Sequence, residues 1–161
     1  RVVAFSGIVN PKRVVMGGTE VARQVDVTED DLTAFVLDLG ESRFVTINSG
    51  WIGGEGGGGT GIVGTEGTIT EAGKSDIVTR EKESSVRLYR NDTNEWKEFP
   101  VEGRLWWIQA GITHLAECIA EGKQPRITIE HARHVIEVIE KVYVAARTGQ
   151  AQEITTTFGS W

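Results

Sequence analysis

The stretch LTAFVLDLGESRFVTINS, residues 32–49, decides the fold of this chain. On each side of Gly40-Glu41, apolar and β-branched residues alternate with polar ones, a pattern typical of β-strands. A glycine between two such runs favours a tight turn. The stretch therefore predicts an antiparallel hairpin with strands at 32–39 and 42–49.

The rest of the first 100 residues also reads as β structure. Short apolar or alternating runs are separated by clusters of turn residues, and none has a helical period. The predicted strands are 1–9, ended by a turn at NPKR (10–13), then 19–27, 61–64, 67–71, and a second hairpin, 85–90 and 95–99, around NDTN.

The last third is predicted to be helical. From Leu105 onward, apolar residues fall on one helical stripe (105, 108, 112, 115, 116 and 119), and Gly122 follows as a C-terminal cap. Thr128 is expected to cap a second helix, with Glu130 in its first turn. That helix closes at 148–149, and AQEITTTF (151–158) is expected to form a final strand. The apolar stripe of this second helix is Ala132, Val135, Ile136, Ile139, Val142, Tyr143 and Ala146.

Strands followed by two helices and a strand indicate an α+β fold: a mainly antiparallel open sheet with two C-terminal helices packed on one face. We expect one domain over residues 1–161. The strand at 32–39 carries Ala34 and Val36 on one face and Phe35, Leu37 and Leu39 on the other. Because helices cover only one face, the other is expected to mediate homo-oligomerisation.

Composition narrows the class of protein. The chain has 161 residues, of which 39% are hydrophobic and 25% charged, as in globular proteins. A net charge of −6 argues against nucleic-acid and anionic-membrane partners. No apolar run reaches membrane-spanning length, and Cys118 is the single cysteine, which suits a reducing cytoplasm. The chain opens within a predicted strand and without Met, so residue 1 is interpreted as a cut.

GGEGGGGTG, residues 53–61, contains the G-x-G-x-x-G spacing twice. In dinucleotide-binding proteins that spacing follows a parallel strand and opens a helix. Here the flanks on both sides read as strands, and no acidic residue follows at the ribose-binding distance. We interpret the stretch as a flexible loop between two strands, and predict that this chain binds no NAD(P).

Other candidate groups have weaker patterns. His131 and His134 share a helix face, which would suit two metal ligands; without a third ligand at metal spacing, a surface or interface pair is favoured. His114 and Cys118 are spaced like a nucleophile pair on a helix, with Trp107 two turns before His114, although a packed cysteine is the commoner case. Trp51, before the glycine stretch, suits either ligand stacking or edge packing.

Several stretches together resemble the C-terminal domain of the glucose–fructose oxidoreductase / inositol dehydrogenase (Gfo/Idh/MocA) family. They are VTEDDLTAFVLDLG (27–40), FVTINSGW (44–51), GIVGTEGTI (61–69) and the run from Gly111 to Phe158. The family shows an acidic pair before an A-x-x-x-F strand, an i-x-G-t-e-G-t step, and a helix ending in G-x-x-P. A long helix closing in Sa-x-tG follows, and here Ala145-Ala146 replaces the usual Ser-Ala. The resemblance covers residues 1–158.

The resemblance implies an NAD(P)-dependent sugar or polyol oxidoreductase whose Rossmann domain and catalytic Lys, Asp and His are absent from this chain. No catalytic, cofactor-binding or metal-binding residue is therefore expected here, and the chain alone is expected to be inactive. This half would supply pocket walls, with Arg13, Trp51 and Trp106 as candidate substrate-binding residues, and the oligomer face. The alternative is a stand-alone α+β binding or assembly module without redox chemistry.

Overall fold

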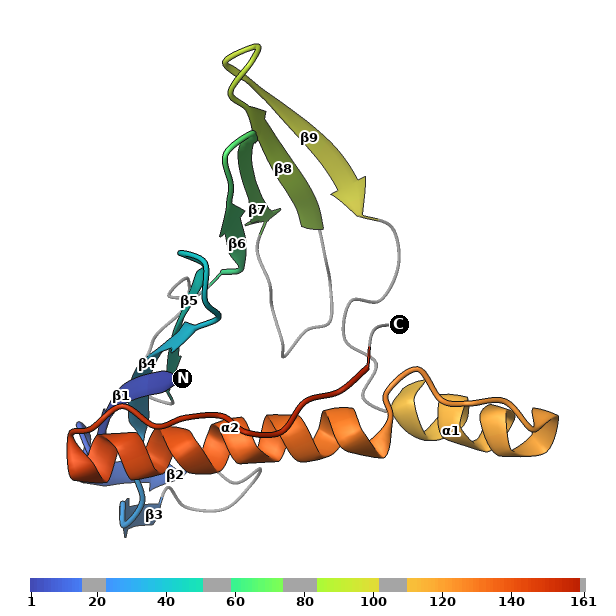
Figure 1. Ribbon diagram of the computed structural model, residues 1–161. Coiled ribbons are helices and arrows are strands. Elements are labelled where there is room, and N and C mark those ends of the chain that lie inside the picture. Colours follow the sequence, from blue (N-terminus) through green and yellow to red (C-terminus); the bar gives the residue numbers. More distant parts are fainter. Residues whose placement is uncertain (16–22, 51–58, 74–83, 102–109, 160–161) are drawn as a thin grey trace. The chain divides into compact units, whose positions relative to one another are not determined.

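The computed structural model describes residues 1–15, 23–50, 59–73, 84–101 and 110–159 (Figure 1). They form two compact units, Arg1–Gly53 with Cys118–Trp161, and Gly54–Glu117. The strands are β1 (Val2–Gly7), β2 (Lys12–Val15), β3 (Arg23–Asp26), β4 (Leu32–Asp38), β5 (Phe44–Gly50), β6 (Gly61–Val63), β7 (Gly67–Gly73), β8 (Ser84–Arg90) and β9 (Glu95–Val101), and the helices are α1 (Ala110–Glu121) and α2 (Ile129–Thr148). The single domain expected over residues 1–161 stays a prediction.

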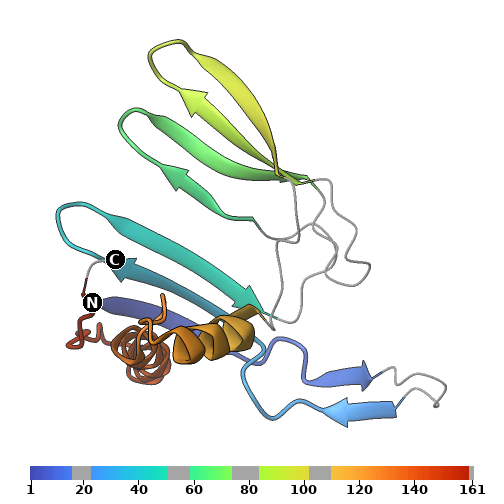
Figure 2. The same cartoon turned by 90° about the vertical axis from the view of Figure 1, so that its right-hand side faces the viewer.

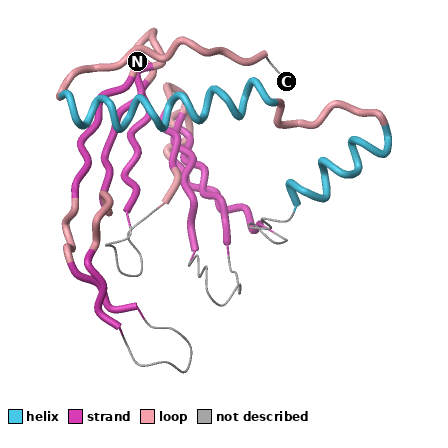
Figure 3. The backbone as a smooth tube through the Cα atoms, turned by 90° about the horizontal axis from the view of Figure 1, so that it is seen from below, coloured by secondary structure: helices cyan, strands magenta, loops and turns pink. Residues whose placement is uncertain are grey.

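The first unit is built on a three-stranded antiparallel sheet in the order β1-β4-β5. The predicted hairpin is confirmed: β4 and β5 pair from Leu32 to Asp38, and the turn between them contains Gly40 at φ 81°. Helix α2 packs on β1 (Figure 3), where Val2 and Ala4 meet Val142 and Ala145 in the buried core.

The prediction of a turn at residues 10–13 is wrong for its second half. Lys12 begins β2, which pairs with β3 as a separate two-stranded arm beyond the three-stranded sheet (Figure 2). The reason is a side-chain contact distant in sequence: the carboxylate of Asp31 holds the bend before β2, as described below. Of the predicted strand at 19–27, Arg23–Asp26 is confirmed as β3, and residues 19–22 lie outside the described part.

Both predicted ends of α2 are confirmed. Thr128 accepts a hydrogen bond from the backbone N–H of His131, as an N-cap does. Gly149 adopts φ 66° and donates its N–H to the carbonyl of Ala145, closing the helix in the left-handed conformation.

The left-handed cap makes Gly149→Ala a direct test of this helix end. A Cβ there meets no neighbouring atom, so the cost is conformational. We expect Gly149→Ala to destabilise the fold by about 1 kcal/mol in urea unfolding. Gly111→Ala is the matched control, because Gly111 lies inside α1 with open space around it, and there alanine should stabilise by about 0.5–1 kcal/mol. Equal effects of the two substitutions would contradict this account.

The strand predicted at 151–158 is wrong. Gln152 makes a single bridge with Val2, and the following residues form no ladder. Residues 150–158, here called the C-terminal strap, instead run back along α2 toward its first turn (Figure 1). The amides of Thr155 and Thr156 bond to a side chain of α2 and so are not used in a sheet.

The second unit contains a four-stranded antiparallel sheet in the order β6-β7-β8-β9. The hairpin predicted around NDTN is confirmed as β8 and β9, with Asn94 at φ 54° in the turn. The strands predicted near 61–64 and 67–71 are confirmed as β6 and β7.

The α+β class is confirmed: antiparallel sheets are followed by two C-terminal helices. The apolar stripe expected on the first helix exists but is exposed, since 75% of Ile112 and 74% of Ile119 is accessible, and Cys118 is the buried side chain of α1. The start of this helix, expected at Leu105, lies outside the described residues. No helix in the described part is long and apolar enough to cross a membrane.

Candidate functional site

Arg13, the first predicted substrate-binding residue, lies on β2 and pairs with Asp31. Its Nη2 is 3.1 Å from Oδ2 of Asp31, whose side chain is only 3% exposed. The same carboxylate accepts hydrogen bonds from the backbone N–H of Val9 at 2.7 Å and of Asn10 at 3.0 Å. Arg13 therefore helps to fix the bend between β1 and the two-stranded arm of β2 and β3.

The environment of Asp31 favours its charged form. The hydrogen bond from Val9 lowers the pKa of this carboxyl most, burial opposes the effect, and Asn10 and the guanidinium of Arg13 lower it further. An ionised carboxylate with three donors is a fixed anchor rather than an acid–base group. The remaining guanidinium donors of Arg13, whose side chain is 27% exposed, are the part that could meet a ligand.

Trp51 and Trp106, the other two predicted substrate-binding residues, lie outside the described residues, as do Trp107 and the glycines at 53–58. Their roles therefore stay predictions.

The two histidines of α2 contact the C-terminal strap. His131 stacks on Phe158, with ring centroids 4.4 Å apart and planes at 8°. Nδ1 of His134 lies 2.7 Å from the carbonyl oxygen of Thr156, so this nitrogen donates. This is an intramolecular role that the i, i+3 spacing did not reveal. Within the described ranges, no three His, Cys, Asp or Glu side chains cluster as metal ligands.

Glu137, one turn after His134, holds the strap most strongly. Its carboxylate accepts hydrogen bonds from the N–H of Thr155 at 2.9 Å, the N–H of Thr156 at 2.7 Å and both threonine hydroxyls. The hydroxyl of Thr156 contributes most to lowering the pKa of Glu137 to about 2, followed by the two backbone amides. Glu137 is thus charged at physiological pH and serves as a clamp for the strap.

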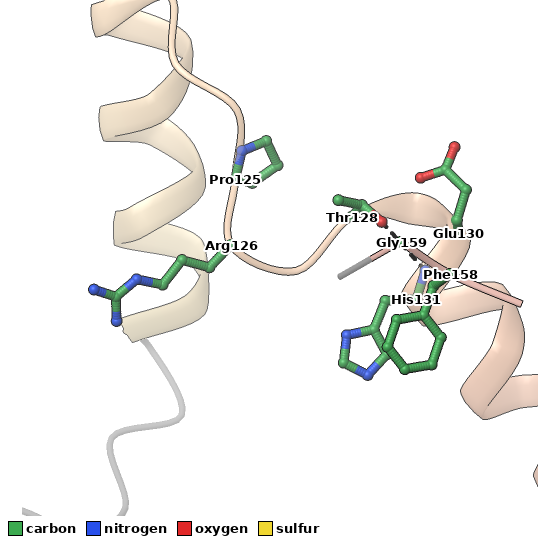
Figure 4. Close-up of a pocket in the computed structure, with 7 residues that line it drawn as sticks. All are labelled: Pro125, Arg126, Thr128, Glu130, His131, Phe158 and Gly159. Atoms are coloured by element: carbon green, nitrogen blue, oxygen red, sulfur yellow. Dashed lines mark hydrogen bonds between the residues drawn. The ribbon is translucent and has the colours of Figure 1, made fainter. Parts of the chain in front are cut away.

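A pocket of about 450 Å³ opens at the first turn of α2, beside the end of the strap (Figure 4). That volume is within the range of small-molecule sites. Its lining residues are Pro125, Arg126, Thr128, Glu130, His131, Phe158 and Gly159.

The polar groups of this pocket are largely engaged in the fold. The backbone amide of Glu130 and the hydroxyl of Thr128 lower the pKa of the Glu130 carboxyl, which keeps it charged at the helix start. The guanidinium of Arg126 points away from Thr128 and His131 in Figure 4. With the rings of Pro125 and Phe158 as walls, the pocket suits an apolar group better than a chemical step.

Cys118 is buried in α1, and its Sγ is 3.7 Å from the carbonyl oxygen of Gln124. This agrees with the packed-cysteine interpretation.

The glycine stretch lies between β5 and β6, and β6 begins at Gly61. The next described element after it is therefore a strand, and every ladder among the described residues is antiparallel. A dinucleotide pyrophosphate requires helix N-terminal amides after a parallel strand. The absence of NAD(P) binding by this chain stays a prediction, which the antiparallel setting of the described flanking strands favours.

No protein-family model and no curated protein matches this chain. Among solved structures, the chain is similar to "putative oxidoreductase yvaA" from Bacillus subtilis, with a TM-score of 0.57 and 17% sequence identity. The match covers 92% of this chain and 44% of that one. The likeness shows a shared fold, and this chain spans less than half the length of that protein.

Sequence reasoning missed the two residues that organise the first unit, Asp31 and Glu137. Asp31 belongs to the acidic pair noted before the A-x-x-x-F strand, so a signal existed. Glu137 begins the stretch EVIEKV (137–142) of a helix with many charged residues, and a carboxylate in such a stretch is usually solvated. Its role depends on the threonines of the strap, which were interpreted as a strand.

Proposed function

We propose that this chain is the substrate-pocket and oligomerisation half of an NAD(P)-dependent sugar or polyol oxidoreductase of the Gfo/Idh/MocA type. Two findings support this assignment: the order and spacing of the motifs from residue 27 to Phe158, and a fold shared with part of a protein described as an oxidoreductase. We further propose a cytoplasmic location, which suits a single buried cysteine.

The observation that carries the proposal is the exposure of apolar side chains on both faces of the β1-β4-β5 sheet. On the face of α2, the helix packs on β1, while Val45 and Ile47 of β5 remain accessible. On the opposite face, Val3, Phe5 and Phe44 are exposed.

Each of these apolar surfaces favours a protein contact. We assign the face opposite α2 to a second copy of the chain, as expected for an open sheet. The α2 side, where Ile136, Ile139 and Tyr143 are also exposed, is assigned to the rest of the enzyme. A chain that builds half of a larger assembly accounts for both surfaces.

In such an enzyme, this half binds and orients the substrate. The cofactor, NAD or NADP, and the acid/base groups would come from outside the chain, because the Rossmann domain and the catalytic Lys, Asp and His of the family have no counterpart in this sequence. Arg13 would offer its remaining donors to substrate hydroxyls or a carboxylate, with Trp51 and Trp106 as further wall residues. A stand-alone binding or assembly module is the alternative, and the two exposed faces are compatible with it.

Assay of the natural gene product separates these alternatives. We expect it to reduce NAD⁺ or NADP⁺ with a sugar or polyol, and Arg13→Lys to raise KM more than it lowers kcat. Titration of this 161-residue chain with NADH and NADPH should show no low-micromolar binding. A natural product without a dinucleotide-binding domain would refute the oxidoreductase proposal. Tight NADH binding lost in a Gly56→Ala, Gly58→Ala double variant would show that the glycine stretch holds phosphate.

The oligomer face gives a direct prediction. Phe5, 80% exposed on the face opposite α2, should lie within the contact between copies. Phe5→Glu would place a charge in that contact, and we expect sedimentation velocity to show the wild-type oligomer converted to monomer. Ile129→Glu is the matched control, since Ile129 is also 80% exposed but lies on α2. A wild-type chain that is monomeric at high micromolar concentration would rule out this interface.

A further inference from the structure

The two faces of the β6-β7-β8-β9 sheet differ in chemistry. The register places Ile69, Leu88 and Lys97 side by side on one face, next to Val86 and Phe99. On the other face, Thr68, Tyr89 and Trp96 lie across three neighbouring strands, next to Thr70, Arg87 and Glu98. We call this second set the polar-aromatic face; Val63 of the edge strand β6 and Pro100 of β9 also lie on it.

The side chains of the polar-aromatic face are already arranged by mutual contacts. Cζ of Arg87 lies 4.7 Å from the centre of the Trp96 ring, and the Tyr89 ring is 5.3 Å from it. The hydroxyl of Tyr89 donates to Asn94 at 2.9 Å, and Ser85 donates to Glu98. These contacts fix the rotamers, yet 46% of Trp96 remains exposed. The result is a preformed aromatic platform surrounded by hydrogen-bonding groups.

We propose that the polar-aromatic face binds a neutral carbohydrate, with a pyranose ring against the part of the Trp96 ring that Arg87 and Tyr89 leave exposed. A sugar ring presents C–H groups on its flat faces and hydroxyls at its edges, so it needs an aromatic plane flanked by donors and acceptors. Arg87 and Glu98 provide one positive and one negative charge, which matches a neutral ligand better than an anionic one. The proposal concerns the second unit alone and does not depend on the proposed oxidoreductase function.

A protein partner fits the opposite face better. That face exposes aliphatic and aromatic side chains together, including Ile62, Ile69 and Phe99, which is the chemistry of protein contacts. On the polar-aromatic face, threonines and charged groups surround the two rings instead. An extended, β-linked oligosaccharide, whose units present flat faces in succession, suits a sheet surface of this kind.

The test is an NMR titration of the full chain with cellohexaose. We expect shifts confined to amides of β7, β8 and β9, and Trp96→Ala should weaken binding at least about tenfold. Phe99→Ala is the matched control, because Phe99 is a 49%-exposed aromatic residue of the same strand on the opposite face. Binding should survive it unchanged. If Trp96→Ala proves unfolded by circular dichroism, Trp96→Leu preserves most of the packing and should show the same loss.

Three outcomes would overturn the proposal. One is the absence of any shift at millimolar cellohexaose. Another is an equal loss of binding in the Phe99→Ala and Trp96→Ala variants. The third is a wild-type self-association that Trp96→Ala abolishes without any sugar present, which would assign the platform to a protein contact.

Discussion

Replacing Asp31 with alanine is expected to destabilise the fold more than any other single side-chain truncation in the first unit. The change removes a buried carboxylate that accepts two backbone N–H bonds and the Arg13 guanidinium. These donors would be left without their acceptor, and a buried donor without a partner is costly. We expect the melting temperature to fall by roughly 5–10 °C, with faster amide exchange at Val9 and Asn10.

Asp30→Ala is the control for this prediction, because Asp30 is the exposed neighbour in the same acidic stretch. It should change the melting temperature little. Arg13→Ala should have a smaller effect than Asp31→Ala, since the two backbone amides would keep their acceptor. The pKa of Asp31 is lowered in the folded state, so its stabilising contribution is present at neutral pH and lost as pH falls through that lowered pKa. Equal effects of Asp30→Ala and Asp31→Ala would contradict the anchoring role.

The second large effect is expected from Glu137→Gln. An amide has one carbonyl oxygen and presents an NH₂ group toward donors, so it cannot replace a carboxylate that accepts from both threonine amides and both hydroxyls. The strap should detach over residues 155–158 while α2 stays folded. Hydrogen exchange at Thr155 and Thr156 should accelerate at least about tenfold, and the melting temperature should fall by about 3–6 °C.

Acid should reproduce the effect of this substitution in the wild-type chain. The pKa of Glu137 is lowered from 4.5 to about 2, so the clamp stabilises the fold fully above the unfolded value and is lost as pH falls from 4.5 toward 2. Glu140→Gln, an exposed carboxylate on the same helix, is the control and should leave strap exchange unchanged. If strap exchange in the wild type did not respond to pH between about 5 and 2, the clamp would not depend on ionised Glu137.

Local sequence signals predicted the elements that depend on neighbouring residues. The 32–49 hairpin, the NDTN hairpin and both caps of α2 follow from alternation, turn glycine and capping chemistry within a few positions. All four are confirmed. The α+β class follows from their order along the chain.

The errors arise where one side chain acts across a long sequence separation. The bend before β2 depends on Asp31, which lies 18 residues after Arg13, so NPKR read alone looked like the end of a strand. Residues 155–156 have β propensity, but their amides bond to Glu137, 18 and 19 residues earlier. Periodicity carries no information about either contact.

The same limit applies to the candidate site. Arg13 was selected as a substrate-binding residue, and its contact with Asp31 could not be read from spacing. The pocket at the start of α2 needs Phe158 and Pro125 to converge from separate segments, and only the course of the strap brings them together. Sequence reasoning identified the histidines of α2 but not Phe158, their aromatic neighbour.

The packing of β1 against α2 has a consequence for how the chain folds. Val2 and Ala4 meet Val142 and Ala145 from opposite ends of the sequence, and the second unit is inserted between these segments. During synthesis, β1 would emerge well before α2, because the whole inserted unit lies between them in the sequence. Such high contact order favours slow folding. The hairpins of the inserted unit, whose contacts are local, should therefore gain protection in pulse-labelling well before Val2 does.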